Sequence, residues 1–331
     1  MMSKILRNPD LYHGERKDKH YFEGWYYKFT DPTMTYAYAV IPGIYLGVSS
    51  KTSHSFIQVL QGRDAKYSYI KYPHDIFCAT QKDLEIKIGK NKFSLTSMEL
   101  SLEHKDLSIQ GVLSFNNLLK WPDSIMNPGS MGYYNYIPFM QCYSQVCAMD
   151  LDLSGSLTIN DKLIDFTGGK GYIEKNWGKS FPYSWTWIQC NNFKGSKISL
   201  SCSIGHIPFL HTSFRGFLIG LFYNNTFYEF TTMNKSKIKI VKNGSDKTII
   251  IENNKYILKI ETKTTKEDFM LCYGPREDDM IPLVEENLMG NVFIELYEKT
   301  SGEILLKKKG NCTGIEYGGE QMMILDAPAM D

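Results

Sequence analysis

Residues 168–191, GGKGYIEKNWGKSFPYSWTWIQCN, bring together the side chains of this sequence that could do chemistry. The run holds three of the chain's five tryptophans, three lysines and one carboxylate. If its first part is a β-strand, Lys170, Tyr172 and Glu174 share one face, because side chains two positions apart point the same way. An amine, a phenol and an acid on one strand face can exchange protons or bind the polar part of a ligand.

A second strand pattern follows the break at residues 178–182. It places Trp185, Trp187 and Gln189 on one face. Together the two strands would offer a carboxylate and two indole rings to a common space. The same side chains could instead form a hydrogen-bonded corner of the core. Charged groups among aromatic rings favour a functional site, since a buried charge is costly unless it is paired or used.

Two other strand patterns place polar side chains among aromatic ones. In the run YFEGWYYKFTD, Glu23 and Trp25 share a face. In the run MQCYSQV, Gln141, Tyr143 and Gln145 share a face. The glutamines and the tyrosine could decorate the surface or line a pocket as neutral hydrogen-bonding groups, and the sequence leaves both possibilities open.

Short alternating runs separated by turn residues fill the rest of the chain. Pairs such as Asn160-Asp161 and Asn224-Asn225 are typical of the turns of β-hairpins. This spacing predicts antiparallel sheets folded as sandwiches or barrels, because βαβ units would need long amphipathic helices between strands. The chain is therefore expected to be all-β, with few helices.

The length and the order of the strand patterns predict two domains. A chain of 331 residues exceeds the size at which one core usually keeps growing. We expect one β domain over residues 1–180, including the strand around Glu174, and a second over residues 181–331, with the site at their seam. Residues 1–20 are expected to form an extended or frayed arm, and residues 268–290 a loop or short helix.

The composition excludes several classes of protein. The 37 basic and 36 acidic residues give a formal net charge of +1, so no global field favours nucleic acid or an anionic membrane. The seven cysteines form no C-x-x-C pair and the seven histidines no H-E-x-x-H motif, so we expect no metal and no cofactor. The start lacks the apolar stretch of a signal peptide, and no run is long enough to span a bilayer, which predicts a soluble, cytoplasmic protein.

The central run resembles the signature of tocopherol cyclases. In that signature a Gly-Lys-Gly-Tyr-x-Glu-Lys-Asn-Trp-Gly run precedes a W-x-W-x-Q strand, and residues 169–189 follow this order. The runs YFEGWYYK and FMQCYSQV also resemble blocks of the family, and the resemblance extends from about residue 20 to the C-terminus. The family is distantly similar to the carotenoid 1,2-hydratases, so the resemblance implies two consecutive lipocalin-like antiparallel β-barrels.

The resemblance also implies an activity. Tocopherol cyclases close a chromanol ring by adding a hydroquinone hydroxyl across a prenyl double bond, and the hydratases add water across a similar alkene with a Tyr-x-Asp acid motif. Tyr172 and Glu174 stand at the positions of that motif, so the resemblance implies that Glu174 is the catalytic acid and Tyr172 its partner. Glutamate keeps the carboxylic acid and lengthens its reach. The implied substrate is a prenylated or phytylated hydroquinone or another isoprenoid.

This chemistry agrees with the residue types. Protonating an alkene requires a neutral carboxylic acid, and burial among aromatic rings raises the pKa of such a group. The carbocation that follows is stabilised by electron-rich ring faces. The expected substrate contacts are Lys170, Asn176, Trp177, Trp185, Trp187, Gln189, Trp25, Glu23, Gln141 and Tyr143.

A second function stays open at this point. A lipocalin-like carrier would bind a hydrophobic isoprenoid without converting it. Both functions imply a hydrophobic small molecule as partner, with a transient membrane contact if that molecule is a lipid, and neither involves nucleic acid.

Overall fold

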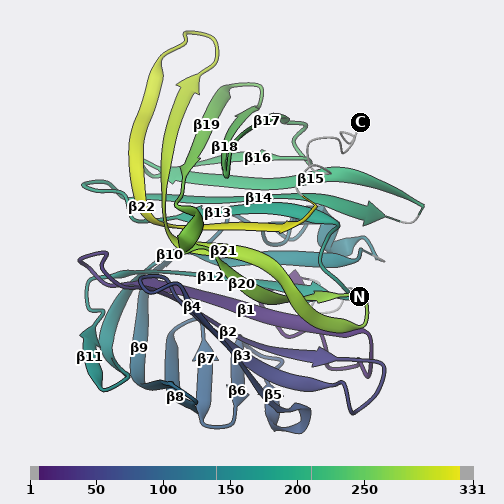
Figure 1. Cartoon of the computed structure of the whole chain (residues 1–331). Coiled ribbons are helices and arrows are strands. Elements are labelled where there is room, and N and C mark those ends of the chain that lie inside the picture. Colours follow the sequence, from purple (N-terminus) through teal and green to yellow (C-terminus); the bar gives the residue numbers. More distant parts are fainter. Residues whose placement is uncertain (1–6, 139, 210, 321–331) are drawn as a thin grey trace. The chain divides into compact units, whose positions relative to one another are not determined.

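The computed structural model describes residues 7–138, 140–209 and 211–320. The elements of these residues are β-strands and three short 3-10 turns, η1 (His74–Ile76), η2 (Gly132–Tyr136) and η3 (Lys266–Asp268), as Figure 1 shows. The all-β prediction is confirmed, with two large antiparallel sheets of which one comes close to closing. None of the described residues belong to a helix long and apolar enough to cross a bilayer.

The chain divides into two compact units, and each is described by itself. The first unit consists of the residues up to Gln61, of Lys66–Phe181 and of Tyr273–Pro282. The second unit consists of Gly62–Ala65, of Pro182–Cys272 and of the residues from Leu283 on. The predicted domains, residues 1–180 and 181–331 with a site at their seam, stay a prediction, and residues 1–6 and 321–331 lie outside the described residues.

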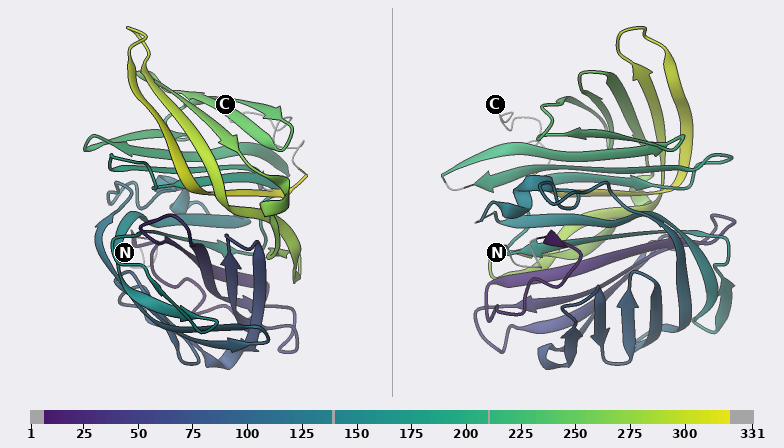
Figure 2. Two further views of the ribbon diagram at one scale, coloured as in Figure 1. Left: turned by 60° about the vertical axis from the view of Figure 1, so that its left-hand side comes forward. Right: turned by 180° about the vertical axis from the view of Figure 1, so that it is seen from behind.

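The first unit is one antiparallel sheet in the order β4-β3-β2-β1-β12-β10-β9-β8-β7-β6-β5, with β11 paired to β10. In Figure 1 the strands β1–β4 run crosswise to β6–β9, and Figure 2 shows this sheet curling around an interior. The strands are β1 (Tyr21–Thr30), β2 (Ala37–Leu46), β3 (His54–Gln61), β4 (Lys66–Pro73), β5 (Phe77–Ala79), β6 (Glu85–Ile88), β7 (Asn91–Ser94), β8 (Ser97–His104), β9 (Leu107–Leu119), β10 (Cys142–Ile159), β11 (Lys162–Asp165) and β12 (Lys170–Gly178).

Burial in the first unit distinguishes its central strands from its outer ones. Strands β6 and β8 alternate between exposed and buried side chains, as expected for strands with one face on the core. Strands β1 and β12 are buried on both faces. Their inward side chains, among them Trp25, Tyr27 and Ile173, belong to one large apolar cluster. The sequence run around Glu174 therefore forms the middle of the sheet.

The second unit is a sheet in the order β16-β15-β14-β13-β22-β21-β19-β18-β17, with β20 paired to β21. The long strands β21 and β22 bend along their length (Figure 1), where register shifts between Asn287 and Val292 mark β-bulges. The strands are β13 (Ser184–Cys190), β14 (Ile198–Phe209), β15 (Thr212–Tyr223), β16 (Thr226–Thr231), β17 (Lys237–Asn243), β18 (Asp246–Glu252), β19 (Tyr256–Lys263), β20 (Met270–Arg276), β21 (Asp279–Glu298) and β22 (Ile304–Gly319).

The two hairpin turns named from the sequence are confirmed. Asn160 and Asp161 have φ values of 47° and 62° and connect β10 to β11, and Asn224 and Asn225 have φ values of 49° and 56° and connect β15 to β16. Two consecutive residues with positive φ are typical of the type I′ turn, whose twist matches that of the flanking strands.

The prediction of a loop or helix over residues 268–290 is wrong. Most of this segment is strand, β20 and the first part of β21. The acidic residues Glu277 and Asp278 form only the two-residue turn between them, with Glu277 at a φ of 53°. Met270 and Cys272, two positions apart, are both buried, as expected for a strand. The alternating run before the charged turn is short, which is why the sequence did not indicate a strand there.

The prediction of an extended or frayed arm over residues 1–20 is wrong for residues 9–14, most of which are buried, whereas residues 15–19 are exposed. Leu11 is fully buried and Asp10 is 5% exposed. The carboxylate of Asp10 accepts hydrogen bonds from Gln145 and Lys120, both at 2.8 Å. This polar segment is ordered because buried polar groups of the sheet bind it, a long-range pairing that local composition does not reveal.

Candidate functional site

Strand β12 lies between β1 and β10, and its register divides the candidate residues between its two faces. Glu174 lies opposite Tyr26 of β1, and Trp177 lies opposite Glu23. We call the side of the sheet that carries Glu174 the Glu174 face, and the opposite side, which carries Lys175, the Lys175 face. Since alternate residues of a strand point to opposite faces, the Lys175 face carries Lys175 and Trp177 and the Glu174 face carries Glu174 and its neighbours two positions away.

On the Glu174 face, a tyrosine and an asparagine donate hydrogen bonds to the carboxyl group of Glu174. The hydroxyl of Tyr172 donates to Oε2 of Glu174 at 2.6 Å, and Nδ2 of Asn176 donates to Oε1 at 3.4 Å. Tyr172 is 1% exposed and Glu174 7%. Both of these hydrogen-bond donors are neutral, and both lie two positions from Glu174 on the same strand. The face predicted from the sequence thus brings Tyr172, Glu174 and Asn176 into contact.

Two further residues of the Glu174 face were not expected from the sequence. Tyr26 lies directly across from Glu174, and Lys28 lies across from Tyr172 and is only 2% exposed. Cys142 of β10 lies on the same face, because it is four positions from Val146, which pairs with Glu174. Burial, and after it the charge of Glu174, raise the pKa of its thiol. The period of two places Tyr26 and Lys28 on one face of β1, but only the pairing of β1 with β12 puts that face beside Glu174.

The Lys175 face holds a buried ion pair. Lys175 and Glu23 form a salt bridge with both side chains fully buried. Nζ of Lys175 also donates to the carbonyl of Leu11 at 2.5 Å. The same ammonium lies 5.1 Å from the ring centroid of Trp25 and 4.7 Å from that of Trp177. The two indoles on this face therefore already surround a cation of the protein itself.

His13 completes the cluster on the Lys175 face. Its ring stacks on Trp177 with centroids 4.1 Å apart, and its Nδ1 lies 3.1 Å from Nζ of Lys175. Burial, and after it the charge of Lys175, lower the pKa of His13, although Glu23 opposes this change. Burial alone would raise the pKa of Glu23, but the charge of Lys175 together with the hydrogen bonds and charge of His13 outweighs burial and holds that pKa below its usual value. Glu23 is consequently a carboxylate.

The structure contradicts the expectation that Trp25, Trp177 and Glu23 share a space with Glu174. All three point to the opposite face of the sheet. The physical reason is the strand period, since Trp177 is an odd number of positions from Glu174. Tyr143 also belongs to the Lys175 face, where it stacks on Trp177 at 5.4 Å and donates its hydroxyl to a backbone carbonyl.

The remaining candidates of the first unit lie at the two ends of β12. Lys170, at the start of the strand, forms ion pairs with Asp150 at 3.1 Å and Asp152 at 2.8 Å. Burial alone would lower the pKa of Lys170, and these two carboxylates raise it instead. Gln141 lies beside the other end, where its backbone carbonyl accepts a hydrogen bond from the amide of Lys179 at 2.9 Å.

Trp185, Trp187 and Gln189 belong to β13 of the second unit. All three are buried and lie on one face, as the alternation predicts, because they pair with Gly318, Glu316 and Gly314 of β22. The indole nitrogen of Trp185 donates a hydrogen bond to the carboxylate of Glu316. Glu316 was not foreseen, since nothing in the local sequence shows that β22 pairs with β13.

Across the described parts of the chain, no three histidine, cysteine, aspartate or glutamate side chains come together as metal ligands would. Among the described residues, the Glu174 face carries a carboxyl, two phenols, an amide, two amines and a thiol. These groups suit proton transfer to or from a bound molecule.

The sequence of the chain matches a family described as tocopherol cyclase-like over residues 103–319, more than half of its length. The chain belongs to the tocopherol cyclase-like family. The resemblance inferred from the central run is confirmed. Strands β10, β12, β13 and β22, which carry most of the candidate residues, lie within the matched region.

Two curated relatives of this family member are plant proteins. The probable chloroplastic tocopherol cyclase of Oryza sativa subsp. japonica is 26% identical over 196 residues, which cover 57% of this chain and 42% of the rice protein. The chloroplastic tocopherol cyclase of Zea mays is 28% identical over 196 residues, 57% of this chain and 41% of the maize protein. The match thus spans about two fifths of the length of these relatives.

Solved structures share the fold. CghA with Sch210972 superposes with a TM-score of 0.58 at 8% identity, covering 91% of this chain and 89% of CghA. Kievitone hydratase from Nectria haematococca superposes with a TM-score of 0.50 at 12% identity, covering 93% of this chain and 92% of the hydratase. Together with the two sheets, these neighbours confirm the predicted fold class of two lipocalin-like antiparallel β structures.

Proposed function

We propose that this tocopherol cyclase-like protein catalyses acid-initiated ring closure of a prenylated or phytylated hydroquinone. The observation that carries the proposal is the buried hydrogen bond between Tyr172 and Glu174. Membership of the family supports a cyclase-like reaction. Burial favours the neutral form of a carboxyl group, and a neutral carboxylic acid is what protonation of an alkene requires.

The proposed reaction is an isomerisation. The carboxylic acid of Glu174 gives its proton to the less substituted carbon of the trisubstituted double bond, and a tertiary cation forms at the other carbon. A hydroquinone oxygen then bonds to the cationic carbon and loses its proton, which restores the acid. No atom is gained or lost, so the chromanol has the mass of the substrate.

Glu174 is the proposed acid rather than Glu23. The salt bridge to Lys175 holds the pKa of Glu23 below its usual value, so this carboxylate has no proton to give near neutral pH. Tyr172 is proposed as the residue that positions Glu174. Tyr26, directly across from the acid, presents an aromatic ring on the same face, which would stabilise a cation. Lys170, Asn176, Trp185, Trp187, Gln189 and Gln141 stay predicted substrate contacts, whereas Tyr143, like Trp177, lies on the Lys175 face.

The test is incubation of the purified protein with a phytylated benzoquinol, followed by mass-resolved chromatography. Wild type should form an isomeric chromanol, and Glu174→Gln should lose roughly 10²–10⁴-fold in turnover while still binding the quinol, as quenching of tryptophan fluorescence reports. Tyr172→Phe should lower kcat about threefold to tenfold with little change in KM, because one neutral hydrogen bond is lost.

Glu99→Gln is the matched control, since Glu99 is an exposed carboxylate of the same unit that pairs with Lys92. It should keep full turnover. Unchanged turnover of Glu174→Gln would contradict the assignment of the acid. Binding of the quinol by wild type without any product would instead favour a carrier for a hydrophobic isoprenoid.

A further inference from the structure

Gly24 is the unusual residue of the Glu174 face. It lies within β1, whose residues are all described, and it alone of them is partly exposed while the others are buried. It pairs with Asn176 of β12, two positions from Glu174, and Asn176 is also partly exposed. Ser144 of β10, partly exposed as well, pairs with Asn176 on the other side. Solvent therefore reaches the Glu174 face at this row of three residues, directly beside the proposed acid.

The fold does not require a glycine at position 24. Its backbone does not have the positive φ that favours glycine. A Cβ atom added there would meet Ile41, Phe56 and the backbone oxygen of Pro42 at 3.7, 3.8 and 3.9 Å, which are ordinary van der Waals distances. A glycine in the middle of a strand is less stable than an alanine by about 0.5–1 kcal/mol. Gly24 thus lowers the stability of the sheet without a reason in the fold.

Gly43, which pairs with Gly24 from β2, shows the opposite situation. A Cβ atom at Gly43 would lie 2.3 Å from the ring of Phe56, so a side chain of the protein already occupies the space over this glycine. At Gly24 the nearest such atom among the described residues is 3.7 Å away, and the backbone is partly exposed. A glycine of this kind inside a strand marks a place where a ligand can approach the backbone closely.

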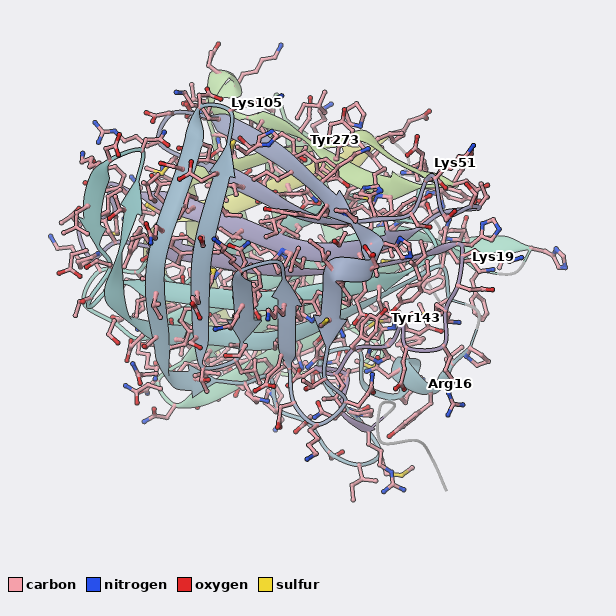
Figure 3. The ribbon with its side chains drawn as sticks, turned by 90° about the horizontal axis from the view of Figure 1, so that it is seen from below. Arg16, Lys19, Lys51, Lys105, Tyr143 and Tyr273 are labelled. Carbon is pink, nitrogen blue, oxygen red and sulfur yellow. The ribbon has the colours of Figure 1, made fainter. Side chains whose placement is uncertain are left out.

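An apolar and largely aromatic border lies beside Gly24. Phe56 belongs to a buried cluster with Phe22, Tyr45 and Met280. Five partly exposed side chains pack against this cluster, namely Ile41, Tyr69, Cys142, Phe181 and Tyr273, the last of which Figure 3 labels. A flat apolar ring suits such a border, because aromatic rings attract one another in offset or edge-on contacts at centroid distances of about 4.5–7 Å.

The position of Gly24 relative to Glu174 suits a ring that carries a prenyl chain. The two residues are diagonal neighbours on adjacent strands of one face, an arrangement that separates two residues by about 7–8 Å. In a prenylated hydroquinone a single methylene group separates the ring from the double bond that reacts. A ring seated on Gly24 therefore brings this double bond toward the carboxyl group of Glu174.

We propose that Gly24 seats the hydroquinone ring of the substrate and limits how bulky that ring can be. The ring lies flat on the backbone of Gly24, with Phe56 and Ile41 at its border and the prenyl double bond beside Glu174. A side chain at position 24 would lift the ring away from the acid, and a displacement of about 1 Å can cost roughly a hundredfold in rate. The inference rests on the proposed function, because that reaction defines the substrate and the acid.

The experiment compares Gly24→Ala and Gly24→Val with wild type on a phytylated benzoquinol. Gly24→Ala should lower kcat/KM about tenfold and Gly24→Val about a hundredfold or more. Both variants should also bind the quinol more weakly, as quenching of tryptophan fluorescence reports. The denaturation midpoint of Gly24→Ala should nevertheless equal or exceed that of wild type, because alanine is the more stable residue in a strand. A purely structural role of Gly24 would instead lower the midpoint together with the turnover.

A substrate series tests which part of the quinol lies on Gly24. Gly24→Ala should lose more turnover on a quinol with a trimethylated ring than on one with an unmethylated ring. Its loss should be the same for phytyl and geranyl chains, because these chains differ far from the ring. A loss that follows the length of the chain and not the substituents of the ring would overturn the proposal.

Ser101→Val is the matched control, since it adds the same side chain at an exposed strand position of β8 in the same unit, and it should bind and react like wild type. Wild-type binding and turnover in both Gly24 variants would overturn the ring seat and leave the proposed reaction standing. If wild type binds the quinol without forming chromanol and Gly24→Ala binds it more weakly, the proposed reaction is overturned and the ring seat stands. Should Gly24→Val fail to fold, Gly24→Ala alone decides.

Discussion

At the scale of single residues, the middle of the first sheet carries two buried glutamates with different partners. Glu23 forms an ion pair with Lys175, whereas Glu174 accepts hydrogen bonds from Tyr172 and Asn176. A charged partner favours the carboxylate, whereas burial on its own favours the neutral acid. Environment, and not residue type, thus gives the proposed catalytic role to Glu174.

The ion pair of Lys175 should matter for stability rather than for turnover. Lys175→Met should lower the free energy of unfolding by about 3–5 kcal/mol, because it leaves the fully buried Glu23 without its cation. Denaturant unfolding measures this loss. The double variant Glu23→Gln with Lys175→Met should recover most of it.

Lys92→Met is the control, because it removes a lysine of the same unit whose ion pair with Glu99 is exposed on both sides. Its loss should be about 1 kcal/mol or less. If Lys175→Met were as mild as Lys92→Met, the description of the Lys175 face as a structural ion-pair cluster would be contradicted.

The sequence predicted part of the candidate site. The period of two placed Lys170, Tyr172 and Glu174 together, and Trp185, Trp187 and Gln189 together, because alternation is local. It could not place Tyr26, Lys28 or Glu316, since these depend on which strands pair. Trp177 is three positions from Glu174, so the same alternation already indicates the opposite face, and the expectation that both line one space neglected it.

At the scale of elements, the segment of residues 9–14, before β1, packs into the first unit. The backbone carbonyl of Leu11 accepts a hydrogen bond from Lys175, and the ring of His13 stacks on Trp177 beside the same lysine. Its composition is polar, so local composition predicted an arm. Its partners lie more than a hundred residues away in the chain, and no local pattern reveals such contacts.

This contact predicts a pH dependence of stability. The pKa of His13 is lower in the folded chain than its ordinary value of 6.5, so below pH 6.5 the unfolded chain binds a proton that the folded chain does not. The free energy of unfolding should therefore be unaffected by His13 above that pH and fall below it, by at most about 1.4 kcal/mol per pH unit.

His13→Asn should remove this part of the slope. The measurement is denaturant unfolding of wild type and variant between about pH 7.5 and pH 5. The exposed His74 supplies the control, and His74→Asn should leave the slope unchanged. A slope that is the same in wild type and His13→Asn would show that His13 takes up its proton equally well in the folded state.

At the scale of the whole molecule, the chain returns to the first unit after residues 182–272 of the second unit. Residues 273–282 belong to the first unit, where Met280 packs with Phe22, Tyr45 and Phe56 in one apolar cluster. Tyr273, labelled in Figure 3, stacks on Tyr69 with centroids 4.9 Å apart. The all-β class was predictable from periodicity, but this return was not, because it is set by packing between distant segments.

A fragment of residues 1–181 should accordingly be less stable than the first unit in the whole chain. Without residues 273–282 the cluster of Phe22, Tyr45 and Phe56 loses Met280, and the exposed apolar surface should bind a hydrophobic dye. Tethering residues 273–282 to the fragment through a flexible linker should reduce dye binding and raise the denaturation midpoint. Equal midpoints with and without the tether would contradict the assignment of this segment to the first unit.

The central claim, that Glu174 starts the reaction by protonating the double bond, is tested most directly by the mass of the product made in D₂O. If an acid of the protein delivers a solvent-exchanged proton to carbon, the chromanol from wild type should carry one deuterium that does not wash out in H₂O, and Glu174→Gln should form almost no product. A wild-type chromanol without carbon-bound deuterium, or a Glu174→Gln variant that incorporates deuterium at the wild-type rate, would contradict it.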